Sequence, residues 1–382
     1  MNKIKVMACI QSLNDGGAQK IVLNNLEGFS SDSNVQFELF VGNHTRKSQY
    51  EKYVMKNKLK VHYLISRPVG LFFSLLSKLH VKINTDGLQK RLWERAINKY
   101  SPDIIHLHIA VLLDKLLEPI QNTNIPIRFL TLHSAPYRQS DKILKKIKTA
   151  FDTEKFIALC LTNDMIEEAK EHYGVKKYEL LRNGTNFKAI QEKIISKEAA
   201  RRVLNIPNDA FIISTVGRLE PVKNYTFLID IFNALLKKRK SALLVFAGEG
   251  SQKEELQRKC EQYGILDKVI FLGNLTNVVP VYCASDVFAL TSLSEASSLV
   301  LLELQQTDGR AVISAGVPSE SIVTDKIQKM SEKATIDMWV DALLNESFVG
   351  KSVCDKKEYD YEYANKRLLE IYLKYWNEYN AK

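Results

Sequence analysis

The chain has 382 residues, 45% hydrophobic and 26% charged, which predicts a soluble globular protein of about two domains. No stretch has the roughly 20 apolar residues that span a bilayer, and the five cysteines include no Cys-x-x-Cys pair, so membrane-spanning, disulfide-framework and zinc-ribbon classes are excluded. The net charge of +10 is concentrated in residues 1–150, where 23 Lys and Arg face 11 Asp and Glu (+12), while the remainder carries −2.

Short apolar runs alternate with helical patterns along the chain, which predicts parallel sheets covered by helices in an α/β fold. The first series of predicted strands comprises residues 3–10, 37–42, 60–65, 103–109, 127–133, 155–162 and 178–184. The second series comprises residues 211–217, 242–248, 268–273, 287–292 and 311–316. Each series predicts a doubly wound, Rossmann-like unit, and such units bind ligands at the carboxyl ends of their strands.

The turn Asn183-Gly184 lies between the two series and predicts the domain boundary. We expect an N-terminal domain at residues 1–183 and a C-terminal domain at residues 184–355. Residues 356–382 contain an amphipathic helical pattern that no strand follows. This pattern predicts a helix that packs back on the N-terminal domain.

Glycines follow the first predicted strand. Gly16 and Gly17 would let a ligand approach the backbone before a helix at residues 18–26, although an ordinary strand-to-helix turn explains them equally well. A second glycine turn, Gly248-Glu249-Gly250, follows the strand at 242–248. A dinucleotide fingerprint would need a third glycine where Lys253 stands, which argues against a nicotinamide site.

Three histidines lie near predicted strand ends. His106 and His108 would project from one face of a strand and could bind a metal, but no acidic ligand motif accompanies them, so we expect no metal site. His133 precedes a turn and is the better candidate for contact with a polar ligand.

Two cations follow the strand at 211–217. Arg218 and Lys223, separated by Pro221, suit a diphosphate, since arginine offers a planar fork and lysine a point charge. A solvated basic loop is the alternative.

Two carboxylates flank an apolar run in the stretch SEASSLVLLE at residues 294–303. Glu295 could complete a capping box with Ser292 at a helix start. Glu303 lies among leucines and is costly to bury unless a partner hydrogen-bonds it. Whether this partner is a ligand or the protein itself is open from the stretch alone.

The ordered combination of Gly16-Gly17, His133, GRLEPVKN, FAGEG, FLGN and Glu295-x7-Glu303 resembles the retaining family-4 glycosyltransferases over nearly the whole chain. The resemblance implies the GT-B fold, in which two Rossmann-like domains face each other across a cleft. It also implies transfer of a sugar from a nucleotide-sugar donor, with UDP favoured, to a glycan or lipid-linked saccharide in surface polysaccharide synthesis, with retention and without a cofactor or metal.

The resemblance also assigns roles to residues. It implies that Arg218 and Lys223 hold the donor diphosphate and that Glu295 contacts the transferred sugar. Glu303 would accept hydrogen bonds from the ribose, while the amides of Ser298 and Leu299 would face phosphate oxygens. Gly17, after Gly16, would lie against the phosphates, and His133 would reach the sugar.

Ala296-Ser297-Ser298 stands where the family commonly has a glycine-bearing run. This departure keeps a second function open, that of a non-catalytic glycosyltransferase-like subunit that binds an acceptor or a partner protein. The chain has neither the glycine fingerprint nor a suitably placed Tyr-x-x-x-Lys, which argues against an epimerase or other oxidoreductase.

The basic N-terminal half predicts an anionic partner. No zinc finger or RNA-recognition signature accompanies the charge, so we expect an anionic membrane surface and no nucleic acid. Residues 67–83 and 141–151 join apolar and Lys-rich faces, as interfacial helices do, although a core-packed helix with a basic outer face fits each of them as well. The apolar start of the chain reaches Asn14 and Asp15 before it attains signal-peptide length. We therefore expect a cytoplasmic protein, peripheral on the inner face of the cell membrane.

Overall fold

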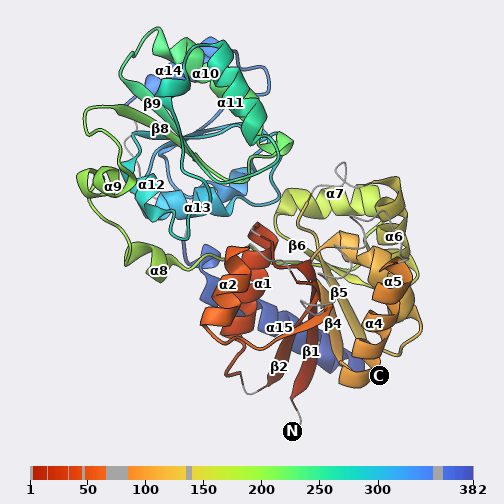
Figure 1. The fold of residues 1–382 in the computed structure, drawn as a ribbon. Coiled ribbons are helices and arrows are strands. Elements are labelled where there is room, and N and C mark those ends of the chain that lie inside the picture. Colours follow the sequence, from red (N-terminus) through yellow and green to blue (C-terminus); the bar gives the residue numbers. More distant parts are fainter. Residues whose placement is uncertain are drawn as a thin grey trace. The chain divides into compact units, whose positions relative to one another are not determined.

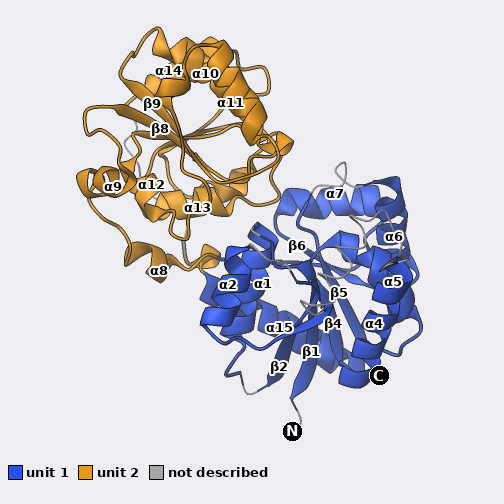
Figure 2. Cartoon of the chain, viewed as in Figure 1, with its two compact units in different colours: residues 1–184, 361–382 blue, residues 185–360 orange. Residues whose placement is uncertain are grey.

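A computed structural model of the chain describes residues 3–14, 16–32, 34–44, 48–65, 85–134, 140–346 and 356–381. The chain forms two compact units (Figure 2). Unit 1 contains residues 1–184 together with residues 361–382, and unit 2 contains residues 185–360. The chain therefore passes from unit 1 to unit 2 after Gly184 and returns after Asp360. The predicted segment 67–83 lies outside the described residues.

Unit 1 contains a seven-stranded parallel sheet in the order β3-β2-β1-β4-β5-β6-β7. Its central strands are almost wholly buried, as expected of a parallel sheet covered on both faces. The strands are β1 (Ile4–Ser12), β2 (Val35–Asn43), β3 (Val61–Ile65), β4 (Ile104–Leu107), β5 (Ile127–Thr131), β6 (Ile157–Cys160) and β7 (Tyr178–Leu180).

Helices α1, α2 and α15 cover one face of this sheet, and α4, α5 and α6 cover the other (Figure 1). Hydroxyl groups of Ser48, Ser140 and Thr162 accept from backbone amides and start α2, α6 and α7, as N-cap residues do. The helices are α1 (Gly17–Gly28), α2 (Gln49–Lys56), α4 (Thr85–Tyr100), η1 (Ala110–Leu112), α5 (Leu113–Gln121), α6 (Asp141–Asp152), α7 (Asn163–Tyr173) and α15 (Tyr361–Asn380).

The C-terminal helix α15 packs on unit 1, as the sequence predicted. Leu368, Ile371 and Tyr372 are buried in the core that β1, β2, β4 and β5 form with α1. The carboxylate of Glu179 on β7 accepts from Arg367 at 2.9 Å and from Lys374 at 2.6 Å. Both apolar burial and ion pairs therefore fix the helix.

Unit 2 contains a six-stranded parallel sheet in the order β10-β9-β8-β11-β12-β13. The last strand was not predicted, because Ile327–Lys329 has three residues and only one of them is apolar. The strands are β8 (Phe211–Val216), β9 (Ala242–Ala247), β10 (Val269–Phe271), β11 (Val287–Leu290), β12 (Ala311–Ile313) and β13 (Ile327–Lys329).

Helices α10, α11 and α14 cover one face of this sheet, and α9, α12 and α13 cover the other (Figure 1). The helices are α8 (Phe187–Gln191), α9 (Lys197–Leu204), η3 (Pro221–Lys223), α10 (Tyr225–Leu236), α11 (Lys253–Gln262), η4 (Leu266–Lys268), α12 (Val279–Ala284), α13 (Leu299–Gln306), η5 (Ser319–Ser321), α14 (Ile336–Leu344) and η6 (Lys356–Tyr359). None of the helices in the described ranges of either unit is long and apolar enough to cross a membrane.

Both sheets have the same relation between chain order and spatial order. The strand order reverses between β1 and β4 in unit 1 and between β8 and β11 in unit 2. In doubly wound sheets, ligands bind outside the carboxyl ends of the strands at this switch point. The loops that follow these four strands are therefore the places to look for a site.

The helix α6 is not a membrane-interfacial helix, which was one of the two interpretations of residues 141–151. Its apolar side chains Ile143, Ile147 and Phe151 are buried within unit 1, so they are not available for insertion into lipid. Lys145 and Lys148 are exposed on its outer side. The alternative of a core-packed helix with a basic outer face is the correct one for this segment.

Candidate functional site

The switch point of unit 2 brings together two loops and the helix α13, which together carry most of the predicted site residues. The loop after β8 carries Arg218 and Lys223, and the loop after β11 carries Glu295 and leads into α13. The amide of Leu293 donates to the Val222 carbonyl at 2.8 Å, and the Thr291 hydroxyl donates to the Lys223 carbonyl at 2.9 Å. These bonds hold the two loops against each other.

Lys223 and Glu295 form an ion pair at this point. Lys223 Nζ lies 2.5 Å from Glu295 Oε1, and the two side chains are 15% and 14% exposed. The Ser292 hydroxyl donates to the same carboxylate oxygen at 2.6 Å, and the Glu295 amide donates to the Gly316 carbonyl at 2.8 Å. Both the position and the orientation of the carboxylate are therefore fixed.

The capping-box interpretation of Ser292 and Glu295 is wrong. The helix α13 begins only at Leu299, and the hydroxyl of Ser292 donates to the Glu295 carboxylate instead of accepting from a helical amide. The motif therefore shapes the loop before the helix and places an acid beside Lys223.

Glycines allow the backbone to approach closely here. Gly217 has φ +155°, and a Cβ atom on it would lie 2.9 Å from the Tyr225 hydroxyl and 3.3 Å from Lys223 Cε. A Cβ atom on Gly248 would lie 2.0 Å from the Gly217 carbonyl oxygen. The glycine turn after β9 therefore serves the packing of the loop that carries Lys223.

Arg218 is exposed on this loop, beside the Glu220 carboxylate. Glu220 accepts from the Ser251 hydroxyl at 2.7 Å and from the Ser251 amide at 3.1 Å. These hydrogen bonds, and to a smaller extent the charge of Arg218, hold the pKa of Glu220 below its usual value. Within the described ranges, no hydrogen bond or ion pair joins Arg218 to Lys223 or Glu295.

Ser298 is the N-cap residue of α13, and Leu299 is its first helical residue. The amide of Ser298 donates to the Ser321 hydroxyl at 3.2 Å. The hydroxyl of Ser298 is buried and has no hydrogen-bond partner among the residues that the structure describes. At the positive end of a helix, this hydroxyl is the polar group that an anion could engage.

Glu303 is 5% exposed on α13, and two protein hydroxyls are among its hydrogen-bond partners. The Tyr282 hydroxyl donates to Oε2 at 2.9 Å, and the Thr185 hydroxyl donates to Oε1 at 3.4 Å. Burial, and next the Glu303 carboxylate, raise the pKa of Tyr282 well above its usual value, so that its hydroxyl stays protonated and donates. The two hydroxyls thus offset the cost of burying this acid among leucines.

Gly16, Gly17 and His133 belong to unit 1. Gly16 is the N-cap residue of α1, and Gly17 begins this helix after β1. His133 follows β5 and is partly exposed, but its Nε2 is enclosed and lacks a hydrogen-bond partner among the described residues. Burial lowers the pKa of the His133 ring below its usual value.

His106 and His108 form a stack at the end of β4, with ring centroids 3.9 Å apart. His106 is fully bonded, since Nδ1 lies 2.6 Å from the Tyr372 hydroxyl and Nε2 lies 2.7 Å from the Thr131 hydroxyl. Both ring nitrogens of His108 are enclosed without a partner among the described residues. Across the described ranges, no group of three or more His, Cys, Asp or Glu side chains could hold a metal ion.

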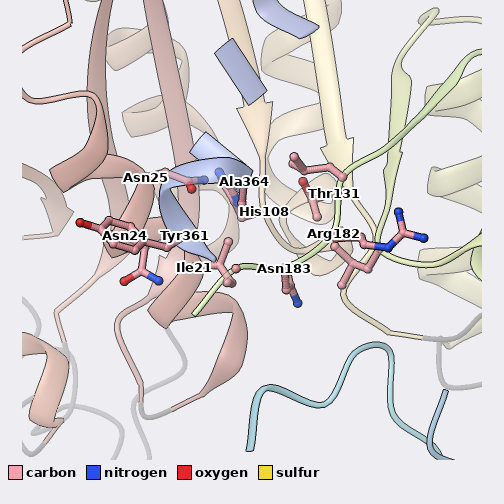
Figure 3. A pocket seen from close by; sticks show the side chains of 12 residues that line it. Ile21, Asn24, Asn25, His108, Thr131, Arg182, Asn183, Tyr361 and Ala364 are labelled. Atoms are coloured by element: carbon pink, nitrogen blue, oxygen red, sulfur yellow. The ribbon is translucent and has the colours of Figure 1, made fainter. Parts of the chain in front are cut away.

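A small cavity lies at the carboxyl ends of the unit 1 strands (Figure 3). Its volume is about 10 Å³, roughly the room for one water molecule and too little for a sugar ring. The lining residues are Ile21, Asn24, Asn25, His108, Thr131, Leu161, Leu181, Arg182, Asn183, Gly184, Tyr361 and Ala364.

The sequence did not reveal several residues that hold the candidate site together. Thr185, Tyr282 and Ser321 contact Glu303 or Ser298 from segments between 21 and 118 residues away. No local pattern links such residues. The burial of Glu303 among leucines was the only available sign that a hydroxyl partner had to exist.

The carboxyl-terminal part of the chain is similar to a known protein family. Residues 196–345 match the family model described as glycosyl transferases group 1. A Bacillus subtilis protein named as the glycosyltransferase EpsF is 22% identical over 358 residues, which are 91% of this chain and 88% of that protein. The Escherichia coli UDP-Gal:alpha-D-GlcNAc-diphosphoundecaprenol alpha-1,3-galactosyltransferase is 23% identical over 265 residues, 65% of this chain and 67% of that protein.

A solved structure extends the similarity to the fold. The crystal structure of HepE from Anabaena in complex with UDP and glucose has a TM-score of 0.74 and 15% sequence identity, and covers 97% of this chain and 100% of that chain. The matched family segment contains Arg218, Lys223, Glu295, Ser298 and Glu303. The chain therefore contains a segment of the glycosyl transferases group 1 type at residues 196–345, and its two parallel α/β units have the GT-B fold.

Proposed function

We propose that this protein is a glycosyltransferase that moves a sugar from a UDP-sugar to a glycan or lipid-linked saccharide in surface polysaccharide synthesis, with retention of anomeric configuration and without a metal. The observation that carries the proposal is the ion pair of Lys223 and Glu295 beside the start of α13, at the switch point of unit 2. The UDP complex of HepE and the UDP-Gal in the name of the E. coli relative support the choice of donor.

The charges fit the departure of a nucleoside diphosphate. When the bond between the sugar and the diphosphate breaks, negative charge builds on the phosphate oxygens. Lys223, Arg218 and the amino end of α13 supply positive charge there, which is the role that a preorganised electrostatic site has in catalysis. These groups make a divalent ion unnecessary in the proposed mechanism.

Glu295 and Glu303 have different roles in this proposal. Glu303 is buried and held by hydroxyl donors, so it suits the ribose hydroxyls, since a carboxylate accepts about four hydrogen bonds. Glu295 is partly exposed beside Lys223 and suits a hydroxyl of the transferred sugar. In unit 1, Gly16 and Gly17 would approach the phosphates and His133 would contact the sugar.

In this proposal, the acceptor attacks the anomeric carbon on the face of the sugar from which the diphosphate leaves, so the configuration is retained. The acceptor oxygen bonds to the anomeric carbon while the bond to the diphosphate breaks, and the acceptor proton passes to a phosphate oxygen. No enzyme carboxylate has to form a covalent intermediate.

The acceptor and the membrane belong to the same proposal. The name of the E. coli relative contains a diphosphoundecaprenol-linked sugar, which supports a lipid-linked acceptor. The exposed Lys145 and Lys148 on α6 give unit 1 a basic surface that anionic lipid would attract. Such contact would be electrostatic and would place the protein at the inner face of the cell membrane.

A non-catalytic role is the second candidate, because the Ser298 side chain stands in a place where the family commonly has a smaller residue. A donor panel separates the two candidates. Purified protein is mixed with UDP-glucose, UDP-galactose, UDP-N-acetylglucosamine and UDP-N-acetylgalactosamine, with and without a chelator, and the release of UDP is measured. We expect release from one donor, unchanged by the chelator and lost in Lys223→Ala. If the protein neither hydrolyses a donor nor binds UDP in calorimetry, the catalytic proposal is wrong and the binding subunit is favoured.

A further inference from the structure

Thr185 connects the candidate nucleotide site to the point where the chain enters unit 2. It is the first residue of unit 2 and is fully buried. Its hydroxyl donates to Glu303 Oε1 at 3.4 Å, across 118 positions of sequence. The residue that begins unit 2 is therefore joined to a carboxylate that lies far from it in the sequence.

The backbone of Thr185 pairs with the segment through which the chain leaves unit 2. Its amide donates to the Tyr359 carbonyl at 2.9 Å, and Thr185 forms a parallel bridge with Asp360, the last residue of the unit. The Asp360 carboxylate accepts from the Phe187 amide at 3.3 Å. The entering and leaving segments are thus joined to each other, and Thr185 joins this pair to Glu303.

Tyr282 holds the other oxygen of the same carboxylate, but it has no part in this pairing. It lies on α12, is 2% exposed, and donates to Glu303 Oε2 at 2.9 Å. Thr185 and Tyr282 therefore fix the same acid from two sides. Among the described residues, Thr185 hydrogen-bonds to the segment at which the chain leaves, and Tyr282 does not.

We propose that Thr185 and Tyr282 are positioning residues that orient the Glu303 carboxylate for the nucleotide, and that Thr185 also transmits occupation of this site to the paired segments 185–187 and 359–360. The proposal rests on the proposed function, since it takes Glu303 as the group that holds the nucleotide. A nucleotide that hydrogen-bonds to Glu303 orders the Thr185 side chain. This ordering strengthens the hydrogen bond from the Thr185 amide to the Tyr359 carbonyl.

Hydrogen exchange of the full chain, with and without saturating UDP, tests this transmission. In the wild-type protein we expect UDP to slow exchange of the amides in 185–187. In Thr185→Val, which keeps the shape and removes the hydroxyl, UDP should still bind, with a Kd about tenfold higher, which corresponds to about 1.4 kcal/mol. The slowing in 185–187 should be lost. Thr185→Ser, which keeps the hydroxyl, should restore it.

Tyr282→Phe is the matched control, because it removes the other donor to Glu303 and leaves the paired segments intact. We expect a similar rise in the Kd for UDP, but full slowing of exchange in 185–187 at saturation. If Thr185→Val does not fold, as judged by circular dichroism, Thr185→Ala carries the same expectation.

Two results would overturn the proposal, and they distinguish failure of transmission through Thr185 from failure of the proposed function. If the wild-type protein binds UDP but Thr185→Val shows the same slowing in 185–187, transmission through Thr185 is wrong while the proposed function stands. If the wild-type protein does not bind UDP, the proposed function itself fails and the role of Thr185 fails with it.

Discussion

The Lys223 ammonium lies 2.5 Å from the Glu295 carboxylate, so the cation proposed to hold the donor diphosphate is paired with an acid of the same unit. This pairing keeps two largely buried charges from being left without a partner. It also fixes the lysine at the switch point of unit 2, where its charge can be directed to a phosphate.

Replacing Lys223 by alanine should lower turnover by about 10²- to 10³-fold, the usual cost of losing one group that stabilises charge in the transition state. Circular dichroism should show an intact fold. Lys223→Arg keeps the charge and should retain part of the activity. Lys238→Ala is the control, since Lys238 lies after the carboxyl end of α10 and forms an exposed ion pair with Asp341. Turnover of Lys223→Ala at the wild-type rate would remove the assigned role.

Replacing Glu303 should act on the donor. Glu303→Gln keeps the size of the side chain and one acceptor oxygen, so we expect a raised KM for the donor and a smaller change in kcat. Glu303→Ala should abolish turnover. It should also cost about 1–3 kcal/mol of stability, because the buried Tyr282 hydroxyl loses its acceptor. Steady-state kinetics and denaturant unfolding measure the two effects, and an unchanged KM in both variants would contradict the role.

The histidine stack in unit 1 should make stability depend on pH. Burial lowers the pKa of His106 from 6.5 to about 3 and that of His108 well below 6.5, so both rings are neutral in the folded protein. The unfolded chain takes up these protons as the pH falls below about 6.5. The stabilisation is therefore fully present above this pH and decreases by about 1.4 kcal/mol per pH unit for each histidine as the pH falls.

Denaturant unfolding between pH 7.5 and 5 measures this slope. His108→Leu should reduce the slope of unfolding free energy against pH by the contribution of one histidine. It should change the free energy of unfolding little near pH 7.5, because the ring nitrogens of His108 have no partner among the described residues. His106→Leu should reduce the slope similarly but destabilise at every pH, since it leaves the Tyr372 and Thr131 hydroxyls without their partner. Parallel slopes in all three proteins would show that these rings are not neutral when folded.

The C-terminal helix should be required for the stability of unit 1. Ile371→Ala removes a fully buried side chain from its core and should cost about 2–5 kcal/mol. Lys366→Ala, on the exposed side of the same helix, is the control. We expect thermal unfolding to show a lower transition for unit 1 and an unchanged one for unit 2. Equal effects of the two substitutions would contradict the assigned packing.

Binding to lipid should be electrostatic. We expect the protein to sediment with vesicles that contain anionic lipid and to be released by salt, because exposed charges are screened over about 10 Å at 0.1 M salt. Charge reversal at Lys145 and Lys148 should lower the bound fraction, whereas reversal at Lys237 and Lys240 of unit 2, equally exposed, should not. Equal binding to neutral vesicles would argue against this mode.

The fold could be predicted from the sequence because each buried parallel strand leaves a continuous apolar run. Ile157–Cys160 and Phe211–Val216 are buried along their whole length, and both were predicted. Ile327–Lys329 is short and at the edge of its sheet, so it left no such run. Incomplete burial alone does not hide a strand, since β3 and β7 are only partly buried and were predicted; β13 was missed because it has no apolar run.

The candidate site could be predicted only in part. The sequence predicted Arg218, Lys223, Glu295 and Glu303 as site residues because each of them stands in a segment that directly follows a predicted strand. Their partners were not predicted, since the Tyr282 and Thr185 hydroxyls reach Glu303 through tertiary packing. The capping box failed for a related reason. Its spacing matched a helix start, but the loop places Ser292 beside the Glu295 carboxylate before the helix begins.

The return of α15 to unit 1 has a consequence for synthesis on the ribosome. Residues 185–360 are continuous, so unit 2 has all of its strands before α15 is translated. Unit 1 is translated first but lacks Leu368, Ile371 and Tyr372 until α15 emerges, so its apolar surface stays uncovered while unit 2 is being made. The half that leaves the ribosome first is thus the half that finishes folding last, and it is the half that a chaperone would have to shield.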